Sequence, residues 1–369
     1  MLQTSARDFL QSQRPVAQLR KLRDDGSGSG FSQDTWAAMC SMGWPAIAVP
    51  EKFGGHGFGY AGLGIVLQET GRSLTSSPLL ASAMMATAAI LQAGGDEQQA
   101  SLLPGIASGA CIATLAFEEG RQHKPHRVEC RADRNADGYV LEGQKRFVLE
   151  GHVADVLIVS ARTRGSADDA DGISLFRVPR DAAGVETAAC QLLDTHVAGE
   201  LRLERVQLPP DALLGEEHKA LPALEYALDC GRIGQSAELL GVAREAFERA
   251  VAYLKERRQF GVPVGSFQAL QHRCAALFGE LELCESLVLS ALQALDGASR
   301  KLAEIASMTK AKLADIAMKA TAEAIQLHGG IGMTDEFDIG FFYKRAQILE
   351  SLLGDRYYHL DRYALQRGY

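Results

Sequence analysis

The segment YLKERRQFGVPVGSFQALQ, which spans Tyr253–Gln271, joins two stretches of helical periodicity through a short Phe-Gly turn. Before the turn, apolar residues recur at three- and four-residue steps as far as Leu254, which predicts a helix that ends near Gln259. After the turn, a second helix is predicted to begin behind Ser266, because serine is a favoured N-cap residue. The segment therefore predicts a C-terminal region built from long helices.

Arg257, beside this turn, has two interpretations. A guanidinium group next to a fresh helix N-terminus offers positive charge together with free backbone N–H groups, a combination that suits a pyrophosphate. Gln268 and Gln271 in the second helix then suit hydroxyl groups or an adenine edge. Alternatively, two core helices are joined by a turn that leaves the arginine in water. The local pattern leaves both interpretations open.

A second informative segment is QLHGGIGMTDEFDIGFFYKRAQILESLLGD, Gln326–Asp355. Its glycines interrupt a helical pattern that reaches His328, although glycine costs about 1 kcal/mol relative to alanine inside a helix. Without a Cβ atom, Gly329 and Gly330 allow a flat or charged ligand to approach the backbone. A simple helix stop is the alternative. A further helix is predicted over about Phe342–Leu353.

The remaining patterns define the order of structural classes along the chain. Helical patterns alternate with glycine-rich connections up to about Glu119, with Ser32 as a predicted N-cap and Asp24–Gly30 as a predicted mobile loop. Short, alternating or β-branched runs follow, which is typical of an antiparallel β domain. Within Tyr139–Leu149, the alternation predicts two strands that meet at EGQK.

Helical periodicity returns after this β region. The chain is thus predicted to be an α+β protein with an N-terminal all-α domain over 1–115, an antiparallel β-barrel-like domain over 116–220 and a C-terminal four-helix bundle over 221–369.

Composition restricts the class of function. The 369 residues are 47% hydrophobic and 23% charged with a net charge of −8, and this argues against a dedicated nucleic-acid binder. The seven cysteines are scattered without a CxxC pair, which predicts reduced thiols in a cytoplasmic protein and no metal site. The first residues lack a signal-peptide core, and no apolar run approaches the roughly 20 residues of a membrane span. We expect no membrane segment.

Taken together, RRQFGVPVGSFQALQ and AIQLHGGIGMTDEFDIGFFYKRA resemble the acyl-CoA dehydrogenase family, whose pattern is Arg-x-Gln-Phe-Gly, then Phe-Gln, then Gln-x-x-Gly-Gly-x-Gly. The α–β–α order, VPEKFGGHGFG and LERVQLPPDALLG also match, so the resemblance covers essentially the whole chain. It implies an α+β fold that binds extended FAD between the β domain and the C-terminal bundle. It also implies a homo-oligomer, a dimer or tetramer, in which the Gly-Gly turn touches the FAD of a neighbouring subunit.

The resemblance further implies a reaction and a set of cofactor contacts. A carboxylate removes the α-proton of an acyl-CoA substrate, hydride passes from the β-carbon to flavin N5, and electrons then pass to an acceptor protein. The dinucleotide is implied to be lined by Arg257, Gln259, Phe260 and Gln268. The partner subunit's FAD is implied to meet Gln326, Gly329 and Gly330, and contacts from the β domain are implied for Phe117, Glu119 and Phe147.

The β domain departs from the family pattern. The family carries Thr-Glu-Pro and a Gly-Ser-Asp loop that hold the flavin and CoA. Here Glu119 matches the glutamate, whereas Glu118 and Gly120 replace its neighbours and Gly-Ser-Asp is missing. Phe147 occupies the position of the family's flavin-side aromatic residue. Leu149 replaces the threonine hydroxyl that reaches flavin N5, so it offers no hydrogen-bond donor.

The catalytic base is also missing from its usual positions. Most family members have a glutamate before a glycine where this chain has Leu353 before Gly354, and a minority have it before an arginine where this chain has Gly231.

Glu350, one helical turn before Leu353, and Asp355 are substitute candidates, with Glu350 preferred; solvated surface carboxylates are the alternative. Two functional hypotheses follow. The chain is either an FAD-dependent acyl-CoA dehydrogenase with its own base, or a non-catalytic or half-catalytic subunit of a hetero-oligomer with a second acyl-CoA dehydrogenase-like chain. A flavin-free helical scaffold is a third possibility.

Overall fold

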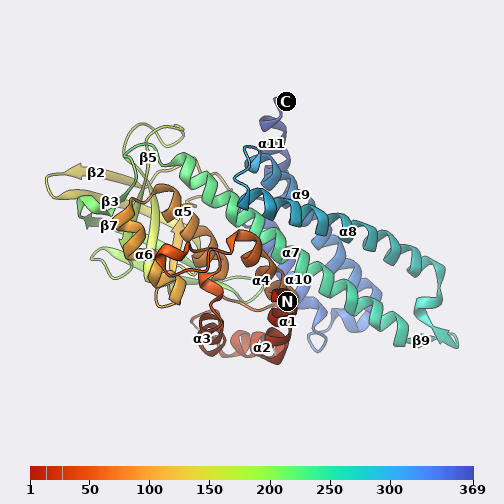
Figure 1. Cartoon of the computed structure of the whole chain (residues 1–369). Helices are drawn as coiled ribbons and strands as arrows, with labels where there is room; N and C mark the ends of the chain where they lie inside the picture. Colours follow the sequence, from red (N-terminus) through yellow and green to blue (C-terminus); the bar gives the residue numbers. More distant parts are fainter. Residues whose placement is uncertain (14, 27) are drawn as a thin grey trace. The chain divides into compact units, whose positions relative to one another are not determined.

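The computed structural model describes residues 1–13, 15–26 and 28–369 (Figure 1). The polypeptide divides into two compact units, each formed from separate parts of the chain. The helical unit comprises Met1–Lys21, Gly64–Thr75 and Arg232–Tyr369, and the sheet unit comprises Leu22–Leu63 and Ser76–Gly231. The predicted order of helices, β-strands and helices along the chain is confirmed.

The N-terminal region is helical, as predicted. Its elements are α1 (Leu2–Ser12), α2 (Pro15–Asp25), α3 (Gln33–Ser41), the short turns η1 (Trp44–Ala46) and η2 (Glu51–Phe53), α4 (Gly59–Ser73), the π-helical turn η3 (Leu79–Ala86), α5 (Thr87–Ala93) and α6 (Asp96–Ser108). The Oγ atom of Ser32 accepts a hydrogen bond from the Thr35 N–H at 3.2 Å, which confirms the predicted N-cap of α3. The predicted loop over Asp24–Gly30 is partly wrong, because α2 continues to Asp25, and its Ser27 lies outside the described residues.

An eight-stranded sheet forms the centre of the sheet unit. Its strands are β1 (Ala113–Ala116), β2 (Arg131–Asn135), β3 (Gly138–Leu149), β4 (Val156–Arg162), β5 (Ile173–Pro179), β6 (Val185–Gln191), β7 (Val197–Leu208) and β8 (Leu213–Leu214). They lie in the order β6-β7-β3-β2-β4-β5-β8, with β1 beside β4. Most pairs are antiparallel, but β1 runs parallel to β4, and β2 touches β4 through one parallel pair. The core includes Leu141, Leu157, Phe176, Leu201 and Val206.

The prediction of two strands within Tyr139–Leu149 is wrong, because β3 is continuous through EGQK. The register of β3 against β7 shifts between Leu141 and Gly143 and again between Lys145 and Val148. Such bulges insert a residue without ending the strand. The resulting break in alternation resembled a strand boundary in the sequence.

The C-terminal region contains the predicted long helices. These are α7 (Leu221–Glu256), α8 (Gln268–Asp296), α9 (Leu302–His328) and α10 (Ile339–Ser351), followed by a further helix that was not predicted, α11 (Arg356–Gln366). Helix α9 packs against α8, α10 and α11. Ser266 is not the N-cap of α8, because its hydroxyl donates to the Pro263 carbonyl at 2.7 Å inside a 3-10 turn, and Phe267 takes the N-cap position.

Helices α4 and α7 meet where both carry glycine. A Cβ atom on Gly241 would lie 1.9 Å from the Gln68 carbonyl oxygen, and one on Gly71 would lie 2.1 Å from the Glu238 carbonyl oxygen. This close approach of two backbones is possible because glycine has no side chain.

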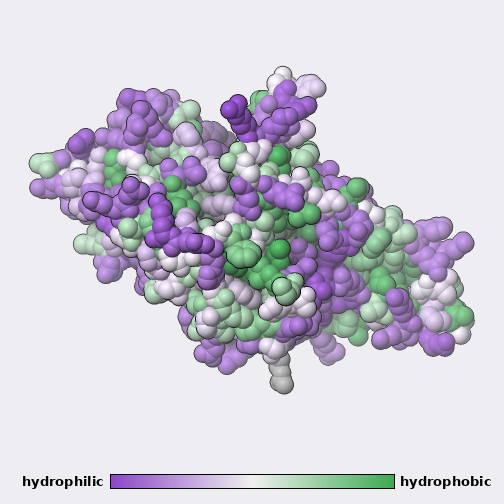
Figure 2. All heavy atoms as spheres, in the orientation of Figure 1, coloured by the Kyte–Doolittle hydropathy of each residue, from purple (hydrophilic) through white to green (hydrophobic). Residues whose placement is uncertain are grey.

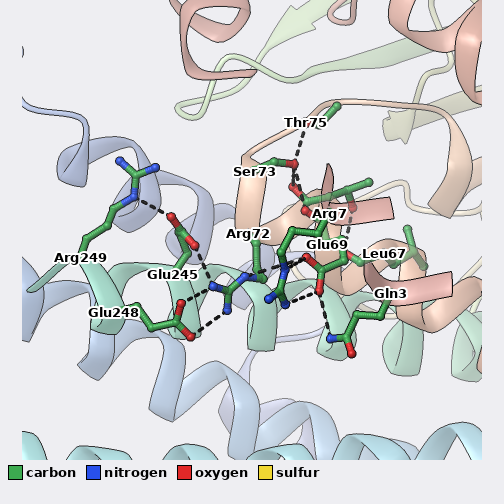
Figure 3. A network of polar contacts seen from close by, with 11 residues as sticks. Gln3, Arg7, Leu67, Glu69, Arg72, Ser73, Thr75, Glu245, Glu248 and Arg249 are labelled. Carbon is green, nitrogen blue, oxygen red and sulfur yellow. Dashed lines mark hydrogen bonds and ion pairs between the residues drawn. The ribbon is translucent and has the colours of Figure 1, made fainter. Parts of the chain in front are cut away.

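The contact also brings Arg72 of α4 to Glu245 and Glu248 of α7 (Figure 3). In the same network, Glu69 is 1% exposed and accepts hydrogen bonds from both Nε (2.9 Å) and Nη2 (2.8 Å) of Arg7, which fixes α1 against α4.

Candidate functional site

A small hairpin joins α7 to α8 and contains two of the predicted cofactor residues, Gln259 and Phe260, with Arg257 directly before it. Strands β9 (Arg258–Gln259) and β10 (Val262–Pro263) are linked by Phe260 and Gly261, which have φ angles of 50° and 80°. Two left-handed residues define a type I′ turn, and Phe260 at its tip is 93% exposed. The Gln259 side-chain amide donates to the adjacent Arg258 carbonyl at 2.8 Å.

The hairpin places a free cation near an uncapped helix N-terminus. The Arg257 backbone is held by hydrogen bonds of 2.8 Å to Tyr253 and Val264, whereas its exposed guanidinium group forms no ion pair with any residue that the structure describes. Helix α8 is 29 residues long, and its N-cap residue Phe267 has no side-chain acceptor for the first N–H groups. Gln268 is exposed in the first turn, while the amide of Gln271 donates to the Gly265 carbonyl at 3.0 Å. This combination offers an anion both charge and N–H donors.

The second predicted site is the glycine turn, the 3-10 segment η6 (Gly329–Met333). Gly329 has a φ angle of 66°, and a Cβ atom on either Gly329 or Gly330 would meet no atom of the described residues within 4 Å. Gln326 is exposed one turn earlier on α9. The backbone of the glycine turn is therefore open to an approaching group.

His328 holds the start of the glycine turn. It is 3% exposed, and its ring lies between the rings of Tyr253 and Phe337, each at a centroid distance of 4.6 Å. Nδ1 contacts the Ala324 carbonyl at 2.6 Å, whereas the buried Nε2 has no hydrogen-bond partner among the described residues. Burial lowers the pKa of His328, so the ring is uncharged at neutral pH.

The third predicted group lies in the sheet unit, where Glu119 has an internal role. Its Oε1 atom accepts from Lys145 Nζ at 2.6 Å and its Oε2 atom accepts from the Glu129 N–H at 2.6 Å. Lys145 has no exposed surface and also donates to Ser160 Oγ at 2.9 Å. Phe117 is buried, and its carbonyl lies 3.5 Å from Lys145 Nζ. The structure therefore brings Phe117 and Glu119 together through a lysine that the sequence argument did not single out.

Phe147 differs from these two residues because its side chain reaches the surface. It is 37% exposed and has a φ angle of 50°, within the second bulge of β3. The Leu149 side chain offers no hydrogen-bond donor, and its carbonyl accepts from Thr114 Oγ1 at 2.6 Å.

The family position of the base lies in a tight segment, Leu352–Asp355, here called the base turn. Leu353 has a φ angle of 60°, which is unusual for a residue other than glycine, and it is 4% exposed. Its carbonyl accepts from Arg232 Nε at 3.3 Å and contacts His359 Nε2 at 3.0 Å.

Lys310 of α9 holds the base turn and the end of α10 by hydrogen bonds. Its buried Nζ atom donates to the carbonyls of Leu349, Glu350 and Gly354 at 2.8, 2.9 and 3.0 Å. The first two belong to the last turn of α10, whose carbonyls lack helical partners and attract positive charge. Burial lowers the pKa of Lys310 to about 7, although the nearby Glu350 carboxylate acts in the opposite direction.

The two candidate bases are engaged at the N-terminus of α11. Asp355 is its N-cap and accepts from the Tyr358 N–H at 2.8 Å. One Glu350 oxygen accepts from the Arg356 N–H at 3.3 Å, and the other accepts from Ser351 Oγ at 3.1 Å. Both carboxylates thus satisfy N–H groups that a helix leaves without internal partners. Among the described residues no group of three or more His, Cys, Asp or Glu side chains could hold a metal ion.

Comparisons with known proteins agree across the chain. Family models for the N-terminal, middle and C-terminal domains of acyl-CoA dehydrogenase match residues 1–110, 116–206 and 221–365. Probable acyl-CoA dehydrogenase YngJ of Bacillus subtilis is 30% identical over 344 residues, covering 91% of this chain and 90% of that relative. Probable acyl-CoA dehydrogenase FadE25 of Mycobacterium tuberculosis is 29% identical and covers 87% of this chain and 83% of its own length.

Solved structures give the same result. A variant of the Tcur3481-Tcur3483 steroid ACAD superposes with a TM-score of 0.89 at 30% identity, over 100% of this chain and 97% of that one. Butyryl-CoA dehydrogenase from Megasphaera elsdenii superposes with a TM-score of 0.92 at 25% identity, over 99% and 97% of the two chains. A chain from a structure titled for the electron transferring flavoprotein of Acidaminococcus fermentans gives 0.90 at 26% identity, over 100% and 98%. The chain therefore belongs to the acyl-CoA dehydrogenase family of flavoprotein oxidoreductases.

Proposed function

We propose that this chain binds FAD and serves the α,β-desaturation of an acyl-CoA thioester. The observation that carries the proposal is the free Arg257 cation beside the uncapped N-terminus of α8, which suits the pyrophosphate of a dinucleotide. Bound FAD supplies the hydride acceptor for the β-carbon of the substrate. The residues that we assign to the dinucleotide of the same subunit are Arg257, Gln259, Phe260 and Gln268.

The glycine turn supports a second part of the proposal, contact with the FAD of a neighbouring subunit. Gly329 and Gly330 leave the backbone uncovered, and no described residue of their own chain fills that space. We assign this contact to Gln326, Gly329 and Gly330. Figure 2 shows hydrophobic atoms in green over α8, whose exposed apolar residues include Phe278, Leu283 and Leu289, and such a surface favours association with another subunit.

The sheet unit contributes an aromatic surface in this proposal. Phe147 is the exposed aromatic side chain that we assign to the flavin ring. Glu119 and the Phe117 carbonyl act indirectly, because the buried Lys145 ammonium links them and fixes the strand that carries Phe147. Without a hydroxyl at Leu149, this chain lacks the donor that the family directs to flavin N5.

A second candidate function is favoured by the base turn. Leu353 has no proton-accepting side-chain atom, and the carboxylates of Glu350 and Asp355 cap α11. We therefore propose a half-catalytic subunit that pairs with a second acyl-CoA dehydrogenase-like chain, which supplies the base. The name of the steroid ACAD that is 30% identical joins two designations, Tcur3481 and Tcur3483, which supports an assembly of two chains. Glu350 is the alternative base within this chain.

Two further assignments belong to the proposal. We propose an electron-transferring flavoprotein as the acceptor, because one structural neighbour comes from a structure of the electron transferring flavoprotein of Acidaminococcus fermentans. We also propose a cytoplasmic location, because all seven cysteines are free thiols. No helix in the described parts of the chain is long and apolar enough to cross a membrane.

The test is an absorbance spectrum of the purified chain, with the ratio of flavin to protein, followed by anaerobic addition of acyl-CoA thioesters of differing length and branching. Bound FAD supports the proposal, and a colourless chain that takes up no FAD overturns it. Flavin bleaching that is lost in Glu350→Gln and kept in the exposed control Glu97→Gln assigns the base to Glu350. Bleaching that requires a second chain establishes the half-catalytic subunit.

A further inference from the structure

Arg20 of α2 contacts the segment that follows the glycine turn, more than 300 residues away in the sequence. Its Nη2 atom donates to the Asp335 carbonyl at 2.6 Å and to Asp338 Oδ1 at 2.8 Å. Nη1 donates to Asp335 Oδ2 at 3.2 Å. The guanidinium carbon also lies 4.6 Å from the ring centroid of Phe341, at the start of α10. One side chain thus holds the backbone, two carboxylates and an aromatic ring of the same short segment.

Asp338, one of these acceptors, is shared with a second arginine. Its Oδ2 atom lies 3.8 Å from Arg249 Nη1 on α7, and the Arg249 guanidinium lies 5.0 Å from the Phe342 ring. Arg249 in turn donates to Glu245 at 2.9 Å.

Glu245 pairs with Arg72 and belongs to the network of Figure 3, which ends at Arg7 on α1. Positively and negatively charged side chains therefore alternate along one network that runs from Arg7 to Arg20. Within it, Asp338 links Arg20 of α2 to Arg249 of α7. Networks of this kind restrain geometry more than isolated surface pairs do.

The glycine turn is therefore held on both sides but left open in the middle. His328 is packed between Tyr253 and Phe337 at the start, and Arg20 holds residues 335–338 at the end. Between these supports, Gly329 and Gly330 have free space above their backbone, and Met333 is 79% exposed. A loop that is fixed at both ends and exposed at its tip is expected where the tip has to bind a ligand in a defined geometry.

We propose that Arg20 is a positioning residue for cofactor binding, which acts by holding residues 335–338 so that the glycine turn meets the FAD of the neighbouring subunit. The inference rests on the proposed function, because it takes FAD as the ligand of the glycine turn. Through Arg20, α2 (Pro15–Asp25) becomes part of the proposed cofactor site, although it lies far before Tyr253–Gln271 and Gln326–Asp355 in the sequence. Loss of the Arg20 contacts with residues 335–338 is expected to speed FAD release without preventing folding.

The test compares wild-type protein and variants in their rate of FAD release after dilution of the holoprotein. The rise in flavin fluorescence reports the released FAD. Arg20→Ala and Arg20→Lys are both expected to release FAD roughly tenfold faster than the wild-type protein. Alanine removes the charge and the hydrogen bonds, whereas lysine keeps the charge but cannot form the planar, forked set of hydrogen bonds of a guanidinium group. The matched control is Lys21→Ala, which removes the adjacent exposed cation of α2, a residue without ion pairs in the described structure. This control is expected to release FAD at the wild-type rate.

Asp338→Asn completes a double-mutant cycle. If Arg20 acts through Asp338, the double variant releases FAD no faster than Arg20→Ala alone, whereas independent roles multiply the two effects. Denaturation midpoints and the elution volume of the oligomer are measured for each variant.

Release rates of Arg20→Ala and Arg20→Lys within twofold of Lys21→Ala overturn the inference, as does faster release that is explained by dissociation of the oligomer. Wild-type protein without bound FAD instead overturns the proposed function itself.

Discussion

Replacing Gly330 by alanine separates the two interpretations of the glycine turn. The added methyl group meets no atom within 4 Å in the part of the chain that the structure describes, and the φ angle of Gly330 lies outside the left-handed region. Alanine at a compatible position stabilises a folded chain by about 0.4–1 kcal/mol, because it reduces the entropy of the unfolded state. If the turn is only a helix stop, Gly330→Ala therefore leaves FAD binding unchanged and raises the free energy of unfolding slightly.

If the turn contacts FAD, the same methyl group enters the space of the ligand. Inserting a methyl group into a packed contact costs about 1–3 kcal/mol, which corresponds to roughly 5- to 150-fold in affinity. The assays are denaturant unfolding of the apoprotein and FAD release from the holoprotein. Gly340→Ala is the matched control, since its methyl group also meets nothing within 4 Å but lies on α10. Gly330→Ala with wild-type FAD retention would refute the assigned role.

Other predictions concern the framework. Lys310 is expected to have a pKa of about 7 in the folded chain and about 10.5 in the unfolded chain, so the unfolded state binds more protons between these two pH values. The free energy of unfolding should therefore rise with pH in this window, by up to about 1.4 kcal/mol per pH unit. In urea titrations at several pH values, Lys310→Met should lose this slope. Gly241→Ala is expected to destabilise the chain by about 1–3 kcal/mol in thermal unfolding, because its methyl group would meet the Gln68 carbonyl, and an unchanged midpoint would contradict the close crossing of α4 and α7. Glu119→Gln should lower the midpoint through the buried Lys145 ammonium, which loses its charged partner, whereas the exposed Glu97→Gln should not.

The parts of the fold that the sequence predicted are those with regular periodicity. The long helices α7 to α10 follow apolar residues at three- and four-residue steps, and Ser32 caps α3 through a contact within one turn. Helix α11 was missed because its sequence is mostly polar, and only His359 is buried along it. The continuity of β3 was missed because its bulges break the alternation that identifies a strand.

The candidate site was predictable only where local sequence determines it. The open backbone at Gly329 and Gly330 follows from residue type alone. The partner of Glu119 lies 26 positions away at Lys145, and the partners of Arg20 lie more than 300 positions away, so no spacing rule reveals them. Lys310 had a local signal, since it lies on the same face as the buried Leu313, Ala314 and Ala317. A lysine within such an apolar stripe indicates a buried partner, which here is the end of α10.

The most direct test of the account is the anaerobic reaction of Leu353→Glu with acyl-CoA. The substitution restores a carboxylate at the family's base position, in a turn that Lys310 and Arg232 already hold. We predict that the wild-type chain alone binds FAD without bleaching and that Leu353→Glu bleaches its flavin with at least one acyl-CoA thioester. Rapid bleaching by the wild-type chain alone, or a Leu353→Glu variant that binds both FAD and acyl-CoA without bleaching, would contradict the assignment of the missing base.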